Sequence, residues 1–325
     1  MSSSNKKIRK TLLIILPITL GVFLVWYFLS KLTPEDKSAI VSSFKSANYW
    51  WVLLSLVLGA LSHLSRAYRW QFMLKPMGYK PKFANSIMTV FISYLVNLGV
   101  PRAGEIARAT GISKYENIPF EKAFGTIVAE RIADAIVLLG IIGLAFFLQA
   151  DLLSEYLFKD GDNGIQKYVI MAVLAILAIS FYFIILKSKN PFFIKIKRFI
   201  NGLIEGGISI FKMDNKWSFI FHTLFIWLMY VLMFYVVSFA LPETSNLPFE
   251  AIIVGFVVGG ISMAVTNGGL GTYPIAVASV LILYHIPDNP ARAFAWIMWT
   301  AQTLMILLFG ALSFLILPIY NRNQN

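Results

Sequence analysis

The amino-acid sequence predicts an all-α polytopic membrane protein with about six full transmembrane helices and two opposed re-entrant helical hairpins, at residues 83–112 and 251–285. Of its 325 residues, 58% are hydrophobic and only 14% are charged, and the mean hydropathy is +0.71. Soluble domains carry about 25% charged residues, so this composition excludes a water-soluble enzyme. It also excludes a nucleic-acid-coating protein, despite the net charge of +12.

A series of apolar segments is long enough to cross a bilayer, which requires about 20 residues of helix. The first segment follows a basic stretch, residues 6–10, but no small-residue cleavage site comes after it, so we interpret it as an uncleaved anchor. The predicted spans are residues 11–29, 50–70, 123–149, 167–186, 218–240 and 293–317.

Basic residues in short loops predict the orientation, because such loops stay cytoplasmic. Residues 1–10, 71–82 and 187–217 are rich in Lys and Arg, whereas loop 150–166 is acidic. A full crossing at 83–99 would place the basic stretch 187–217 outside. We therefore expect both termini in the cytoplasm of an integral inner-membrane protein, with the first hairpin dipping in from the cytoplasmic side and the second from the outer side.

The two hairpins have similar sequence layouts. Residues 83–149 and 251–317 each contain a hairpin followed by a span, with the polar break at a similar depth. Hairpins that enter from opposite faces would form an inverted repeat, the arrangement from which transporters build a midplane site. The alternative is a chance pairing within a single integral membrane domain of residues 1–325.

The first break carries charges where the bilayer should exclude them. It runs from Asn97 to Arg108 and includes Pro101, Arg102 and Glu105. On a returning helix the three charges would share one face. Two guanidinium groups beside a carboxylate suit bidentate capture of a phosphate. The alternative is an ordinary cytoplasmic loop with solvated ion pairs.

The span 123–149 holds a second charged cluster, Glu130, Arg131 and Asp134. Charges at this depth are expensive and usually face a cavity or a partner. We expect them to line the site, and the alternative is a self-neutralising cluster that pins the hairpin to this helix.

Two further places could belong to the site. Arg66 and Arg69 end the second span beside Trp70, where the ordinary interpretation is snorkelling arginines and an interfacial tryptophan. The second break has no charge, but its glycines and a new helix beginning near Pro274 would favour an anion. The alternative there is a simple kink. Its candidate residues are Asn267, Gly268, Gly269 and Gly271.

Nothing in the sequence indicates a metal or another cofactor. The chain has no cysteine, and its three histidines lack the spacing of a metal site. We therefore expect neither.

Four motifs recur in a familiar order: Arg66-Ala-Tyr-Arg69-Trp70, the break from Asn97 to Arg108, Glu130-Arg131-x2-Asp134, and Asn267-Gly-Gly-Leu-Gly271. Together they resemble the lysylphosphatidylglycerol synthase transmembrane, or flippase-like, family. In many members a residue separates the proline and arginine of the first break, whereas here Pro101 and Arg102 are adjacent. Many members also have a proline before the glycines and an acidic residue after them, where this chain has Asn267 and Pro274.

The resemblance implies a membrane domain that moves a lipid with a charged headgroup between leaflets. We expect a standalone member without the soluble aminoacyl-transfer domain, because the chain stops at Asn325. We expect a transporter rather than an enzyme, with membrane phospholipids or a lipid-linked substrate as partners. The alternatives are a membrane-embedded transferase acting on a polyprenyl-phosphate or aminoacyl lipid, and a binding protein that delivers lipid to a separate lipid-modifying enzyme.

Overall fold

The computed structural model describes residues 33–100, 102–149, 212–266 and 268–322, together with residues 26, 30, 194, 201 and 210. The chain divides into two compact units, residues 1–128 with 217–325, and residues 129–216. Every regular element in the described ranges is helical, which confirms the predicted all-α class there.

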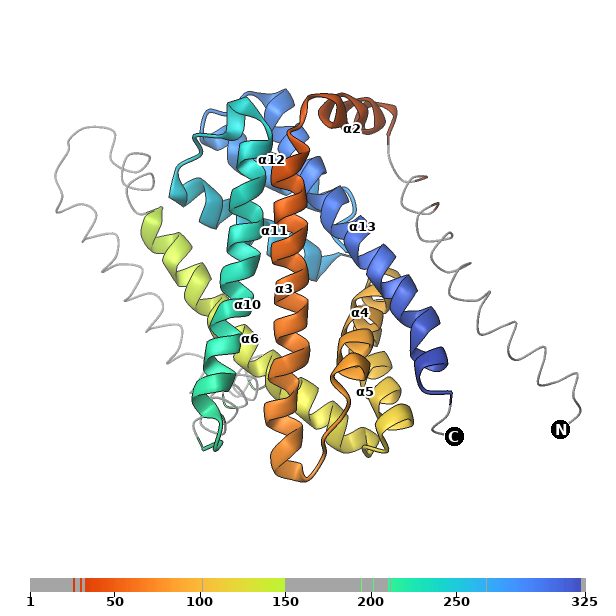
Figure 1. The fold of residues 1–325 in the computed structure, drawn as a ribbon. Helices are drawn as coiled ribbons and strands as arrows, with labels where there is room; N and C mark the ends of the chain where they lie inside the picture. Colours follow the sequence, from red (N-terminus) through yellow and green to blue (C-terminus); the bar gives the residue numbers. More distant parts are fainter. Residues whose placement is uncertain are drawn as a thin grey trace, which may run out of the picture. The chain divides into compact units, whose positions relative to one another are not determined.

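Within each described range the helices follow one another along the chain with short connections (Figure 1). They are α2 (Pro34–Ser46), α3 (Tyr49–Leu74), η1 (Lys75–Met77), α4 (Phe83–Gly99), α5 (Ala103–Glu116), α6 (Phe120–Leu148), α10 (Lys216–Val237), η2 (Ser238–Ala240), η3 (Pro242–Thr244), α11 (Phe249–Val265), α12 (Thr272–Leu283) and α13 (Asp288–Tyr320).

Four helical segments among the described residues are long and apolar enough to cross a membrane: α3 with η1, α6, α10 with η2, and α13. They match the spans predicted at 50–70, 123–149, 218–240 and 293–317, which are thereby confirmed in length and composition. The spans predicted at 11–29 and 167–186, and most of the basic stretch 187–217, lie outside the described residues.

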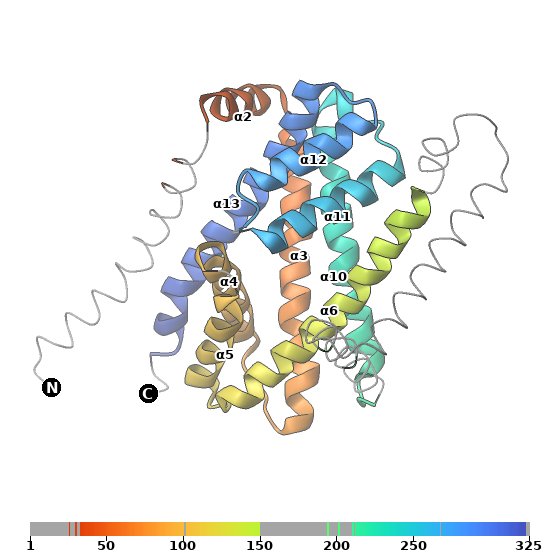
Figure 2. The same cartoon turned by 180° about the vertical axis from the view of Figure 1, so that it is seen from behind.

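Two helical hairpins occupy the places predicted for the broken segments. Helices α4 and α5 pack side by side, and so do α11 and α12 (Figure 2). The connection between α4 and α5, called here the first elbow, contains Arg102, whose φ of 64° lies in the left-handed region. The connection between α11 and α12, called here the second elbow, contains Gly268, Gly269 and Gly271 at φ of 63°, 71° and 69°. Residues other than glycine adopt this backbone conformation only at a cost. Whether the hairpins are re-entrant in a bilayer stays a prediction.

Helix α13 supports both hairpins, one at each end. Its C-terminal half runs antiparallel to α4. Asn321 exchanges two amide hydrogen bonds with Asn85, and a Cβ at Gly310 would lie 2.6 Å from the Cβ of Leu95. Its N-terminal half packs against α12, and Trp299 Nε1 donates to the carbonyl oxygen of Gly268 at 2.8 Å. The base of each hairpin is the end opposite its elbow, and the two bases therefore lie toward opposite ends of α13.

The tips of the two hairpins meet. A Cβ placed on Gly268 would lie 2.8 Å from Cδ2 of Leu98, the penultimate residue of α4. The contact joins the C-terminal end of α4 to the second elbow. The element order of α4–α5–α6 also recurs in α11–α12–α13, and the first helix of each series, α4 or α11, has 17 residues. The inverted repeat itself stays a prediction.

Helix α10 runs antiparallel to α3. Near one end, the backbone N–H of Asn48 donates to the carbonyl oxygen of Ala240 at 2.8 Å. Toward the other end, Arg69 Nη1 donates to Thr223 Oγ1 at 2.8 Å. A separate apolar cluster joins the last turn of α3 to α5 and the start of α6, around Trp70.

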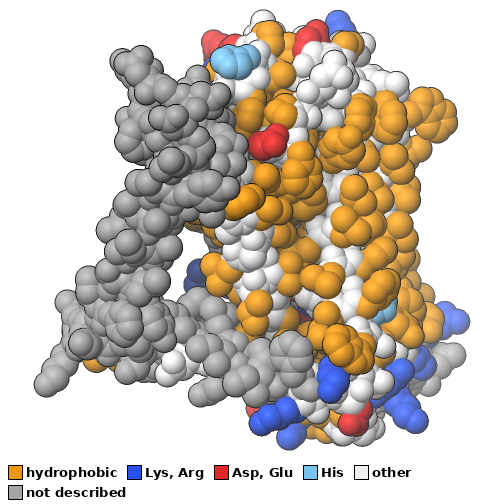
Figure 3. Space-filling model, turned by 90° about the vertical axis from the view of Figure 1, so that its left-hand side faces the viewer, with side chains coloured by type: hydrophobic (Ala, Val, Ile, Leu, Met, Phe, Trp, Pro, Cys, Tyr) orange, Lys and Arg blue, Asp and Glu red, His pale blue; other side chains and the backbone are white. Residues whose placement is uncertain are grey.

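The first unit carries basic side chains at one end. The end of α3, the base of the first hairpin, the start of α6 and the end of α13 lie there, as Lys82 shows by contacting the ring of Tyr320. Figure 3 shows Lys and Arg side chains gathered along the lower edge of one face, below a large hydrophobic area. The exposed basic residues of this end, called here the basic end, are Lys75, Lys80, Lys82, Lys114, Lys122 and Arg322.

Candidate functional site

A stripe of ionisable side chains runs along α3. His63, Arg66 and Arg69 are three residues apart, so they project from neighbouring positions on one side of the helix. All three are buried, with exposed fractions of 4%, 3% and 0%. Trp70 is also fully buried. The snorkelling and interfacial interpretations are therefore wrong, because these side chains turn into the protein rather than toward a membrane surface.

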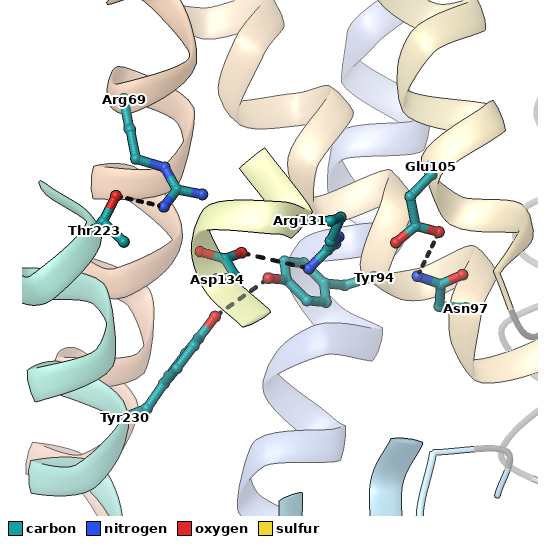
Figure 4. A network of polar contacts seen from close by, with 8 residues as sticks. All are labelled: Arg69, Tyr94, Asn97, Glu105, Arg131, Asp134, Thr223 and Tyr230. Carbon is teal, nitrogen blue, oxygen red and sulfur yellow. Dashed lines mark hydrogen bonds and ion pairs between the residues drawn. The ribbon is translucent and has the colours of Figure 1, made fainter. Parts of the chain in front are cut away.

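Arg69 is held by α10. Its Nη1 donates to Thr223 Oγ1 at 2.8 Å, and its guanidinium carbon lies 5.1 Å from the centre of the Phe219 ring (Figure 4). Thr223 Oγ1 in turn donates to the carbonyl oxygen of Phe219. Arg69 thus faces a hydroxyl and an aromatic ring from a helix more than 150 positions later in the sequence.

Further along α3, histidine and tyrosine side chains join three helices. The His63 ring lies 4.5 Å from that of Tyr94 on α4 and 6.2 Å from that of Tyr230 on α10. The two tyrosine hydroxyls lie 3.2 Å apart and share a hydrogen bond (Figure 4). Closer to the C-terminal end of α3, Ser65 Oγ and His222 Nδ1 form a hydrogen bond of 2.8 Å.

Arg108 stacks on Trp70. Its guanidinium carbon lies 3.9 Å from the centre of the indole ring, a cation–π geometry. The indole Nε1 donates to Thr126 Oγ1 at 2.8 Å, so Trp70 connects α3, α5 and the first turns of α6. Arg108 is 2% exposed, which places a second arginine-bearing helix inside the first unit.

The first elbow is closed by Asn97. Its Oδ1 accepts from the backbone N–H of Gly104 at 2.8 Å, and its Nδ2 donates to Glu105 Oε2 at 3.5 Å (Figure 4). A side-chain oxygen on the second N–H of a helix is the usual capping contact. Here it comes from the other arm of the hairpin, so Asn97 and Glu105, predicted as ligand-binding residues, also have a structural part.

The three charges of the first elbow do not share one helix face. Arg102 is the N-cap residue with a left-handed backbone, so helical spacing does not carry it onto the face of Glu105 and Arg108. Arg102 is exposed, Glu105 is half-buried and Arg108 is buried. The prediction of a common face is therefore wrong for Arg102.

The second elbow is uncharged and is tied to α13. Gly268 accepts from Trp299, and Thr266 Oγ1 and Thr272 Oγ1 share a hydrogen bond of 2.8 Å across the elbow. Gly269 is buried, whereas Gly271 is half-buried at the N-cap of α12. Asn267 lies outside the described residues.

The acidic cluster of α6 belongs to the second unit. Within it, Arg131 Nη1 lies 3.8 Å from Asp134 Oδ2, an ion pair one turn apart (Figure 4). Glu130 and Asp134 are buried. That these three residues line a common site with the arginines of the first unit stays a prediction.

Helix geometry places the polar groups of the first unit at successive depths. At 1.5 Å per residue, Arg69 lies about 8 Å from the last residue of α3, Arg66 about 12 Å and His63 about 16 Å. Asn97 lies about 21 Å from the first residue of α4, which starts at the same basic end. A hydrocarbon core is about 30 Å thick, and the series extends over about two thirds of that length, measured from the basic end.

Three of these residues were missed in the sequence. Tyr94, Thr223 and Tyr230 sit within apolar helices, where single hydroxyl groups are ordinary. The only sequence signal for this part of the site is the spacing of His63, Arg66 and Arg69 along α3, and that spacing does not identify the side chains of distant helices that contact them. Among the described residues, no group of three metal-ligating side chains occurs.

The sequence pattern of the family described as the lysylphosphatidylglycerol synthase TM region matches residues 14–310. The chain belongs to this family. The match extends through α3, both hairpins and most of α13, so it includes every polar group of the candidate site in the first unit.

Several proteins similar to this chain come from archaea. A UPF0104 membrane protein of Methanocaldococcus jannaschii is 24% identical over 304 residues, covering 86% of this chain and 88% of that protein. A UPF0104 membrane protein of Pyrococcus horikoshii is 28% identical over 200 residues, or 60% of this chain and 53% of that protein. Glycosyltransferase AglD of Haloferax volcanii is 30% identical over 110 residues, only 18% of its length. No solved structure matches the sequence.

Proposed function

We propose that this chain is a lipid transporter of the flippase type, which carries a phosphate-containing headgroup between leaflets while the acyl chains stay in the bilayer. The observation that carries the proposal is the set of three arginines, Arg66, Arg69 and Arg108, buried inside a bundle of membrane helices. Ionisable side chains at such depth are costly and commonly mark a substrate path.

The chemistry of these arginines fits a lipid phosphate. A guanidinium group presents a planar fork of N–H donors that matches two phosphate oxygens, and charge-assisted bonds of this kind are among the strongest in proteins. The polar series on α3 spaces such donors along a line from the basic end toward the meeting hairpins. A headgroup would exchange the Thr223 and Phe219 contacts of Arg69 for its own oxygens.

The hairpins supply the other half of the proposal. Irregular backbone at membrane depth is tolerated where it is buried in protein or lines a wet cavity. Tips that meet from opposite ends of α13 support two re-entrant elbows around a midplane passage. The basic end supports a cytoplasmic location for the first hairpin and the C-terminus, in an inner membrane.

Transport is tested in vesicles that contain the purified chain and a trace of phosphatidylglycerol carrying a fluorescent nitrobenzoxadiazole group on one acyl chain. Dithionite added outside bleaches only the outer leaflet. We expect bleaching to pass from about half of the label in protein-free vesicles to nearly all of it when the chain is present. Equal bleaching in both would contradict the proposal.

The site assignment is tested with Arg69→Gln, which keeps polarity and removes the fork. Loss of a charge-assisted hydrogen bond costs about 1.5–3 kcal/mol, so the rate should fall by about 10- to 100-fold. The matched control is Arg292→Gln, because Arg292 is exposed at the N-terminal end of α13, away from the basic end. In the described structure it pairs only with Asp288, at 2.8 Å. A normal rate in a folded Arg69→Gln protein would refute the assignment.

The competing function is a membrane-embedded transferase, and the name of the partial relative AglD favours it. The same vesicles separate the two functions when the lipids are extracted and weighed by mass spectrometry. Unchanged lipid mass with movement between leaflets supports transport. A new lipid mass that depends on an added sugar or aminoacyl donor supports the transferase.

A further inference from the structure

Two side chains in the middle of the first unit hold buried nitrogen atoms that make no hydrogen bond among the described residues. One is Nδ1 of His63 on α3, a residue that is 4% exposed. The other is Nε1 of Trp227, a half-buried residue of α10. At 1.5 Å per residue, His63 lies about 16 Å from the end of α3, and Trp227 lies about 15 Å from Trp217 at the start of the antiparallel α10. Buried polar atoms usually find a partner, so two exceptions at one depth call for an explanation.

Both nitrogens belong to one cluster of rings. The centre of the His63 ring lies 4.5 Å from that of Tyr94 and 6.2 Å from that of Tyr230. The Trp227 ring lies 6.1 Å from the same Tyr230 ring. The two tyrosine hydroxyls share a hydrogen bond of 3.2 Å (Figure 4). Helices α3, α4 and α10 therefore bring these four side chains together in what is called here the ring cluster.

The two nitrogens specify the chemical class of a ligand. An indole N–H only donates, so Trp227 needs an acceptor. A neutral imidazole nitrogen donates or accepts according to the tautomer, so His63 Nδ1 needs a partner that can match either state. A hydroxyl group meets both requirements because it donates and accepts, whereas an ammonium group only donates and leaves Trp227 unpaired. Aromatic walls with a few polar atoms are also the usual lining of a small-molecule site.

We propose that the ring cluster binds hydroxyl groups of the lipid headgroup, so that the substrate is a phospholipid whose phosphate carries a polyol, either glycerol or a sugar-like ring. The inference rests on the proposed transport function, which places the phosphate at the arginines of α3. His63 lies about 9 Å from Arg69 along that helix, so a group attached to the phosphate extends along α3 toward the ring cluster. An apolar group in its place leaves the buried nitrogens unpaired, which weakens binding.

Headgroup selectivity is tested in the vesicles described above, with labelled lipids that differ only in the group on the phosphate. Phosphatidylglycerol and phosphatidylethanol form the matched pair, because both are singly charged phosphodiesters and only the glycerol group carries hydroxyls. We expect phosphatidylglycerol to cross about tenfold faster, as the loss of two hydrogen bonds predicts. Phosphatidylethanolamine that crosses as fast as phosphatidylglycerol contradicts the hydroxyl requirement. The faster lipid of phosphatidylglycerol and phosphatidylinositol identifies which polyol the ring cluster takes.

The assignment to the ring cluster is tested with His63→Phe and Trp227→Phe, which keep an aromatic ring and remove the nitrogens. The measured quantity is the ratio of the rates for phosphatidylglycerol and phosphatidylethanol. We expect this ratio to fall severalfold, toward unity, in each variant. The matched control is Trp217→Phe, because Trp217 is 72% exposed on the same helix as Trp227, and this variant should keep the wild-type ratio.

The outcomes separate this inference from the transport proposal. Equal rates for the matched pair in the wild type overturn the hydroxyl site and leave transport standing, whether or not any variant folds. A wild-type ratio in both ring-cluster variants overturns the assignment to these residues.

If no labelled lipid moves, transport is refuted and binding in detergent judges the site. The purified chain is then titrated by calorimetry with dihexanoyl phosphatidylglycerol and dihexanoyl phosphatidylethanol. Tighter binding of the glycerol lipid that is lost in His63→Phe supports hydroxyl recognition. Equal binding of the two lipids by the wild type overturns it.

Discussion

Gly104 is where the two arms of the first hairpin come closest. A Cβ at this position would collide with the backbone carbonyl oxygen of Ser93 and lie 2.7 Å from the Asn97 amide. Because a backbone oxygen cannot rotate away, Gly104→Ala should force the arms apart. Overpacking of this kind costs about 1–3 kcal/mol, so we expect a lower midpoint of thermal unfolding in detergent, followed by tryptophan fluorescence.

The control for this substitution is Gly125→Ala. Gly125 lies within α6, is exposed, and has open space where its Cβ would be. Alanine is about 0.8–1.0 kcal/mol more favourable than glycine inside a helix, so this variant should be as stable as the wild type or more so. Equal destabilisation of both variants would show that Gly104 is not a close contact.

Arg108 and Trp70 should be energetically coupled. Their stacking predicts a coupling energy of about 0.5–2 kcal/mol in the double-mutant cycle of Arg108→Gln and Trp70→Leu, as expected for cation–π pairs. The cycle cancels the separate cost of losing a buried arginine and a buried indole. Additive effects on unfolding would mean that the contact contributes nothing.

At this scale the sequence identified which residues matter better than it identified their surroundings. Arg66 and Arg69 stand near a helix end, where snorkelling and burial fit the same spacing. The partner of Arg69, Thr223, is 154 positions away, and no local pattern connects them. Asn97 caps a helix that starts beyond a turn, so the capping signal expected immediately before a helix was absent.

At the scale of elements, the apolar segments and their polar interruptions were predictable. Length and composition specify a membrane helix, and clusters of Asn, Gly and Pro end one. The contacts of the elbows were not predictable, because they depend on how α13 places one hairpin against the other. Gly310 permits the approach of α4, and Trp299 fixes the second elbow.

The meeting of the tips predicts a specific cross-link. The chain has no native cysteine, so Leu98→Cys combined with Gly268→Cys gives a defined pair. We expect a disulfide to form readily with copper phenanthroline and to shift the mobility of the chain once a protease site is inserted between the two hairpins. The control pair, Leu98→Cys with Ser245→Cys, should not cross-link, because α11 separates Ser245 from the second elbow by about 25 Å. Efficient cross-linking of the control, or none in the test pair, would contradict the contact.

At the scale of the whole molecule, charge placement connects fold and function. The basic end gathers residues from loops far apart in the sequence, among them loop 71–82 and the C-terminus, for both of which the sequence predicts a cytoplasmic location. If the basic end is cytoplasmic, the two hairpins approach the midplane from opposite leaflets. That opposition underlies the transport proposal.

The most direct test labels one cysteine beside each elbow with a membrane-impermeant maleimide. Val100 and Val265 flank the elbows and are 60% and 79% exposed, so cysteines there are accessible without disturbing the packing. Lys80→Cys and Glu243→Cys serve as exposed markers for the two ends. We expect Val100→Cys to react only from the cytoplasmic side, in inverted vesicles, and Val265→Cys only from the outer side, in intact cells. Reaction of both from the same side, or of neither, would contradict two opposed elbows that open to water.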